Sequence, residues 1–110
     1  MTQPPDGRIV GGMDAAEHDR LLALLEANHQ FPGPFFLAVI AVNEDDVALA
    51  VRAAVHETLD EIPDDDAWEA RASSGGRYLS HRVTVVVESA GQVLALFGRL
   101  RAVPGVVAVL

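Results

Sequence analysis

Ser80 and His81 are the residues whose types could supply a nucleophile and its general base. They lie in an alternating run, residues 78–87, that is typical of a β-strand. Because successive strand side chains point to opposite faces, the Ser80 hydroxyl and the His81 imidazole cannot meet. We expect His81 to be partly buried and hydrogen-bonded instead. Since no other residues form a catalytic constellation, we predict that the protein is not an enzyme.

Three other groups of residues could form binding sites, and for each a structural role is the better explanation: the histidines, the acidic residues and the glycines. The four histidines show no i, i+4 pairing, and the acidic run at residues 60–66 lacks the spacing and turn glycine of a calcium loop. We therefore expect no metal site and no cofactor. Gly75 and Gly76 could present backbone amides to an anion, with Arg77 close by. The interpretation we favour for the two glycines is a two-residue hairpin turn with positive φ.

The alternating run assigns each of its residues to one face of the strand. The face expected to join the core carries Leu79, His81, Val83, Val85 and Val87. Tyr78 and Arg82 are expected on the other face, where they meet water, a ligand or another protein. The segment 76–78 is faintly similar to a motif of RNA-binding domains, but Ser80 and Arg82 then stand where bases should stack. Tyr78 and Arg82 are therefore the best candidates for a functional surface.

The composition argues against several classes of function. The 110 residues fit one domain and carry a net charge of −8, which argues against binding to nucleic acids and anionic membranes. The acidic residues precede residue 71 with the single exception of Glu88, whereas five of the eight arginines lie in residues 71–110. The chain has no cysteine, no signal-like N-terminus and no apolar run of membrane-spanning length. We expect a cytoplasmic protein.

The N-terminal part of the chain is expected to lie outside the main domain. Residues 1–12 show no periodicity and are predicted to be a disordered tail. Residues 13–30 are predicted to form a helix and a linker, and Asp14 and Glu17 have the spacing of a capping box. Leucines at helical spacing follow one side of this helix.

The first half of residues 31–110 predicts a strand and a helix. The apolar run 35–42 is typical of a central strand that is buried on both faces. Asn43 is expected to cap the following helix, which stops before residue 62. An acidic loop then leads to a strand at about residues 68–73 and to the hairpin.

The second half completes an α+β domain. Ser89 and Gln92 form a second capping box before a helix, and residues 106–110 form a last strand. The order strand, helix, strand, strand, helix, strand predicts a ferredoxin-like βαββαβ sandwich, in which a four-stranded antiparallel sheet carries two helices on one face. The helix in residues 13–30 is additional to this fold.

Three motifs carry a family resemblance: Phe31-Pro-x-Pro-Phe, Ser73-Ser74-x-Gly76-x-Tyr78-x-Ser80 and a closing helix-Pro-Gly-Val-Val-x-x-Leu. Over roughly residues 24–110 the chain resembles the YbeD-like family, small bacterial proteins of unknown function. The resemblance implies a ferredoxin-like fold similar to ACT domains, which are regulatory modules that bind amino acids at dimer interfaces. ACT domains hold their ligand near a glycine between the first strand and the first helix, where this chain has Ala41-Val42-Asn43-Glu44.

Two functions remain open at this point. One is a non-catalytic regulatory or protein-interaction module, ACT-like, that self-associates or docks on a protein partner. The other is a small-molecule binding protein, for an amino acid or related metabolite, with a pocket near Asn43. The candidate ligand or partner surface comprises Asn43, Ser73, Ser74, Gly76, Arg77, Tyr78, Ser80 and Arg82.

The strand at residues 35–42 also predicts an apolar strip on the face away from the helices. If Leu37 and Val39 point to the helices, then Phe36, Ala38 and Ile40 point the other way. We expect this strip to be covered, either by the leucine-rich N-terminal helix of the same chain or by a second subunit.

Overall fold

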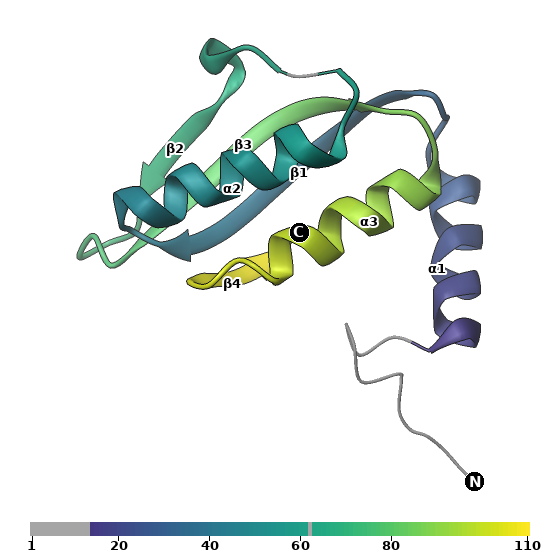
Figure 1. The fold of residues 1–110 in the computed structure, drawn as a ribbon, viewed down its shortest axis with the longest axis horizontal. Helices are drawn as coiled ribbons and strands as arrows, with labels where there is room; N and C mark the ends of the chain where they lie inside the picture. The colour runs from purple at the N-terminus through teal and green to yellow at the C-terminus, as the bar shows by residue number, and fades with distance from the viewer. Residues whose placement is uncertain (1–13, 62) are drawn as a thin grey trace, which may run out of the picture. The chain divides into compact units, whose positions relative to one another are not determined.

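The computed structural model describes residues 14–61 and 63–110 (Figure 1). The disordered tail expected at residues 1–12 lies outside the described residues. The chain divides into two compact units, residues 1–30 and residues 31–110. The second unit contains the whole sheet and two of the helices.

α1 (Ala15–Asn28) is the helix of the first unit. Its N-cap is Asp14, whose Oδ1 accepts a hydrogen bond of 2.8 Å from the Glu17 backbone N–H. This is one of the two hydrogen bonds that the capping-box spacing predicts. At the other end, the Asn28 Nδ2 donates to the Leu24 carbonyl at 2.7 Å and reinforces the last turn.

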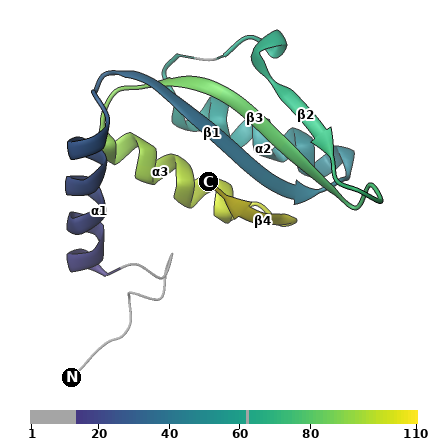
Figure 2. The same ribbon diagram turned by 180° about the vertical axis from the view of Figure 1, so that it is seen from behind.

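The second unit is an α+β structure built on one antiparallel sheet. Its elements are β1 (Gly33–Val42), α2 (Asp45–Thr58), the short 3-10 turn η2 (Asp65–Ala67), β2 (Glu69–Ala72), β3 (Tyr78–Val87), α3 (Ala90–Arg101) and β4 (Val106–Val109). The strand order is β2-β3-β1-β4. α2 and α3 lie on one face of the sheet, and the view from behind shows the other face in front of them (Figures 1 and 2). We call this other face the open face.

The core lies between the sheet and the two helices. Alternate residues of β1 and β3 form its sheet side, as the period-two pattern predicts: Leu37, Val39, Ala41, Val83, Val85 and Val87 are buried. The helices contribute Val47, Val51, Ala54, Val55, Ala90, Val93, Leu96 and Leu100. Phe35 and Phe97 meet edge to face with their ring centroids 6.1 Å apart, a favourable geometry for two aromatic rings.

β1 is a central strand, but the prediction that both of its faces are buried is wrong. Ala38 is 8% exposed, whereas Phe36 on the same face is 59% exposed. The two helices of this unit cover one face of the sheet only, so side chains on the open face meet no second layer within the unit. A small alanine is shielded by its neighbours on the sheet, while a phenylalanine extends beyond them.

The two helices of the second unit begin differently. α3 has the predicted cap: the Ser89 Oγ accepts from the Gln92 N–H at 3.2 Å, and the Gln92 Oε1 accepts from the Glu88 N–H at 2.7 Å. For α2 the prediction is wrong, because the N-cap is Glu44 and not Asn43. The Glu44 side chain makes no capping hydrogen bond, and Asn43 has another role in the loop beside it.

Both edge strands are shorter than predicted, and β4 begins at a constrained turn. β2 begins at Glu69 and β4 ends at Val109. Gly105, before β4, has φ +97°, and a Cβ there would lie 2.9 Å from a methyl group of Val47. Glycine is therefore required for two reasons: the backbone has a positive φ, and the turn lies too close to α2 to leave room for a Cβ.

Candidate interaction surface

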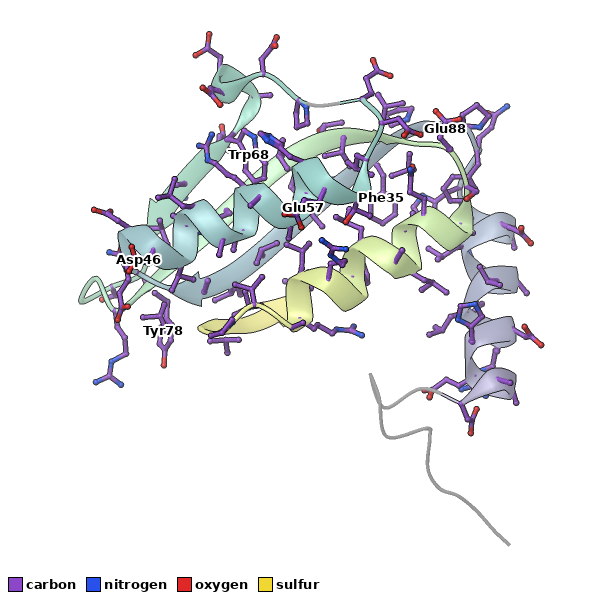
Figure 3. The ribbon with its side chains drawn as sticks, viewed as in Figure 1. Phe35, Asp46, Glu57, Trp68, Tyr78 and Glu88 are labelled. Carbon is purple, nitrogen blue, oxygen red and sulfur yellow. The ribbon has the colours of Figure 1, made fainter. Side chains whose placement is uncertain are left out.

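The structure divides the residues proposed from the sequence into two groups. One group lies in the β2–β3 loop and at the end of β1 beside it: Asn43, Ser73, Ser74, Gly76 and Arg77. The other group lies on β3 at alternate positions, with its side chains on the open face: Tyr78, Ser80 and Arg82. Figure 3 shows Tyr78 at the loop end of the sheet, where the two groups adjoin.

The β2–β3 loop spans five residues, 73–77, so the predicted two-residue turn is wrong. Gly75 and Gly76 do have positive φ, +91° and +77°. The Gly76 N–H donates to the Ser73 carbonyl at 2.8 Å, and the Tyr78 N–H donates to the Ser73 Oγ at 3.1 Å. Because these donors are used within the loop, fewer amides remain to bind an anion.

Asn43 joins the end of β1 to this loop. Its Nδ2 donates to the Gly76 carbonyl at 2.9 Å, and its backbone N–H donates to the Arg77 carbonyl, also at 2.9 Å. Asp45 and Asp46 follow in the first turn of α2, where their carboxylates suit the positive end of the helix dipole. The same carboxylates oppose the binding of an anionic ligand beside Asn43.

The open face carries charged residues on β2 and β3. Antiparallel pairing sets Glu69 opposite Arg82 and Arg71 opposite Ser80. Together with Ala70, these residues line a shallow depression of about 320 Å³. The sequence analysis missed Glu69 and Arg71, although the alternation Glu-Ala-Arg-Ala in residues 69–72 would have placed both on one face.

An apolar strip lies beside these charged residues, on β1 and on the residue that follows β4. It consists of Phe36, Ala38 and Ile40 together with Leu110. Ala38 pairs with Arg82 on one side and exchanges two backbone hydrogen bonds with Leu110 on the other, at 3.3 and 2.8 Å. Phe36 and Leu110 are 59% and 67% exposed. The open face therefore changes from apolar at β1 and Leu110 to charged on β3 and β2.

The arginines of the open face differ from Arg52 and Arg99 of the helices. Arg52 bonds Asp65 at 3.1 Å, and Arg99 forms an ion pair with Glu57. Within residues 14–61 and 63–110, no hydrogen bond or ion pair engages the guanidinium of Arg71 or Arg82. These two exposed cations are thus available to a partner.

His81 lies on the opposite face of β3 and is buried, as is Trp68, and Arg52 is near enough to act on both side chains. The Arg52 guanidinium lies 4.8 Å from the centre of the Trp68 ring, and Figure 3 shows Trp68 beside α2. His81 is 3% exposed, and its Nε2 has no hydrogen-bond partner, so the prediction of a partly buried, hydrogen-bonded histidine is wrong. Burial and, to a smaller extent, the positive charge of Arg52 lower the pKa of His81.

Neither a metal centre nor a membrane span is found in the part of the chain that the structure describes. No three histidine, aspartate or glutamate side chains of this part are grouped to hold a metal ion. No helix among the same residues is both long and apolar enough to cross a bilayer.

Comparison with known proteins gives a family and no function. A family model described as "Protein of unknown function (DUF493)" matches residues 26–110. This match confirms the resemblance to the YbeD-like family that the three sequence motifs carry. A comparison with curated proteins finds no match.

Proposed function

For this chain, which belongs to the DUF493 family of proteins of unknown function, we propose the role of a non-catalytic regulatory or protein-interaction module that docks a protein partner on its open face. One observation carries the proposal: exposed apolar residues and unpaired arginines adjoin on the same face of the sheet. Phe36 and Leu110 offer apolar area, and Arg82 offers a charged group one strand away. Interfaces combine such apolar anchors with arginine.

The architecture supports assignment to the ferredoxin-like, ACT-like class. The chain order of the second unit is β1, α2, β2, β3, α3, β4, and two split units of this kind form the ferredoxin-like motif. The sheet order β2-β3-β1-β4 places the first and third strands at the centre, with α2 and α3 on one face. The two helices therefore leave the open face without a second layer within this unit.

The placement of the chemically active side chains supports a non-catalytic role. Ser80 lies on the open face and His81 is buried on the core side of the same strand, so the hydroxyl and the imidazole are separated by the sheet. Asn43 and Ser73 are engaged with the backbone of the β2–β3 loop, where they shape the loop.

The depression on the open face favours one alternative function. Its volume of about 320 Å³ is at the lower limit of small-molecule sites, and Arg71, Arg82 and Ser80 could bind a carboxylate. The alternative is therefore a module that binds a small effector, an amino acid or related metabolite, in the depression instead of near Asn43.

A photo-crosslinking experiment tests the proposed function in the native cell. A photoreactive phenylalanine analogue replaces Phe36 in one variant and Leu49, an apolar residue of α2 that is also exposed, in the control. We expect a crosslinked protein of one defined mass from position 36 only, and its loss when Arg82→Glu is added. Equal products from both positions would contradict the proposal.

A thermal-shift screen with amino acids tests the alternative function, because a specific ligand raises the melting temperature of the protein as the ligand concentration increases.

A further inference from the structure

The dimensions of the apolar strip suit a helix of a partner protein. Phe36 and Ile40 are four residues apart on β1, which is roughly 14 Å along a strand. A helix covers that length with about nine residues, between two and three turns. The exposed face of a sheet is commonly completed by a layer of helices, and an amphipathic helix presents one continuous apolar side.

The charges beside the strip indicate the composition of that helix. Arg82 is paired with Ala38, in the middle of the strip, and Arg71 lies one strand further from it. Glu69 is the one acidic residue among the charged residues of β2 and β3, so the two guanidinium groups of Arg71 and Arg82 are in excess. A helix lying along β1 would place one of its flanks above these arginines, and carboxylates on that flank would be complementary to them.

The remainder of the second unit has the opposite charge. Acidic residues occupy α2 and the connection to β2: Asp45, Asp46, Glu57, Asp60, Glu61, Asp64, Asp65 and Asp66. An acidic partner is therefore repelled from the helical side and attracted to the open face. A second copy of the chain fits less well, because its open face would bring two further unpaired guanidiniums and one carboxylate.

We propose that the partner is a protein that lays an acidic amphipathic helix along β1, with its apolar side on Phe36 and Leu110 and its carboxylates against Arg82 and Arg71. This inference rests on the proposed docking function. It adds the chemistry of the partner, which the open face alone does not specify.

Two synthetic peptides test the inference against the full chain. Each has about 16 residues, long enough to form a helix, with leucines on one side. The first carries glutamates on the polar side, and the second carries lysines at the same positions. Fluorescence anisotropy of the labelled peptides gives their affinity, and amide NMR spectra of the protein locate the binding site.

We expect the glutamate peptide to bind at least roughly tenfold more tightly than the lysine peptide. The amides of Phe36, Arg82 and Thr84 should shift, and those of α2 should not. Raising the salt concentration from about 0.1 M to about 1 M should weaken the binding by screening the arginines.

Matched variants locate the binding energy. Phe36→Ser and Arg82→Glu should each weaken binding of the glutamate peptide by roughly tenfold or more. Leu49→Ser on α2 likewise replaces an exposed apolar side chain by serine, and Arg101→Glu on α3 reverses the charge of an arginine; both should leave the affinity unchanged. Dispersed amide spectra for all four variants show that the fold is retained.

The other outcomes would overturn the inference in distinguishable ways. Equal binding of both peptides at the open face would support docking of a protein there but refute an acidic partner. Binding of a short single-stranded RNA, with no binding of either peptide, would show that the open face binds a nucleic acid and not a protein helix. A full-chain dimer that Phe36→Ser dissociates would assign the face to a second copy. Tighter binding of the glutamate peptide after Leu22→Asp would show that the leucines of α1 compete with the peptide for the open face. Binding of neither peptide, with a chain that stays monomeric, would refute both this inference and the proposed docking function.

Discussion

The imidazole of His81 is buried in surroundings that favour its neutral form. His81 is 3% exposed, its Nε2 lacks a hydrogen-bond partner, and the neighbouring Arg52 is positively charged. Both the loss of solvation and the nearby cation disfavour the imidazolium form. The sequence places His81 on the core face by alternation, but it does not show that the side chain is almost fully buried or that Arg52 lies near it. Both depend on where α2 lies against β3.

Lowering the pH should therefore destabilise the protein through His81. The pKa of His81 lies below its ordinary value of 6.5 in the folded state, so the unfolded chain binds more protons as the pH falls below about 6.5. The free energy of unfolding then decreases with falling pH, by at most about 1.4 kcal/mol per pH unit from this group. Above that range His81 is neutral in both states and has no effect.

Urea unfolding between pH 5 and pH 8 measures this contribution when the protein is compared with His81→Leu. The leucine variant cannot titrate at this position, so its stability should decrease less between pH 6.5 and pH 5. All other side chains are the same in the two proteins, so the difference between the curves isolates position 81. Parallel curves would show that His81 is protonated equally easily in the folded and unfolded chains.

At the scale of the elements, neighbouring residues of β3 lie on opposite faces of the sheet, one in the core and the next on the open face. Val85 is 2% exposed, and its neighbour Thr84 is exposed. Val85→Asp should reduce the free energy of unfolding by roughly 4 kcal/mol, because it places an unpaired carboxylate in the core. Thr84→Asp should cost far less than that. Chemical denaturation of both variants checks the difference, and equal losses would show that the assignment of faces fails in solution.

The turn before β4 offers a second matched pair among the glycines. Gly105→Ala combines a positive φ with a Cβ 2.9 Å from Val47, so we expect it to destabilise the protein by roughly 1–3 kcal/mol. Gly98→Ala lies within α3, where a Cβ would meet nothing within 4 Å, and it should stabilise by about 0.5–1 kcal/mol. Thermal unfolding measures both. Two changes of the same sign would contradict the close approach of this turn to α2.

Local patterns predict most of the elements, whereas the pairing of strands determines the candidate surface. Alternation in residues 78–87 and the Ser89 cap follow from neighbouring residues, and the structure confirms both. Asn43 has the residue type of a helix cap, yet its amide bonds to Gly76, 33 positions away. The alternation in residues 69–72 puts Glu69 and Arg71 on one face of β2, but only the pairing of β2 with β3 sets them beside Arg82 and Ser80. The Asn43–Gly76 contact joins distant segments and leaves no signal in either segment alone.

At the scale of the whole molecule, the second unit holds its own core. The buried residues of both the sheet and the helices belong to residues 31–110. A chain that begins at His29 should therefore fold, and its amide spectrum should retain the dispersed signals of β1 and β3. Loss of this dispersion would show that the N-terminal segment is needed for the fold.

Light scattering on the full chain and on this shortened chain then determines what covers the apolar strip. A partner of different sequence, as the arginine excess of the open face indicates, leaves both chains monomeric at low concentration. If the leucines of α1 cover the strip, removing them exposes Phe36, and only the shortened chain dimerises or aggregates. If a second copy covers it, both chains dimerise and Phe36→Asp dissociates them. We expect two monomers, and we expect the acidic helical peptide to bind both of them with the same affinity.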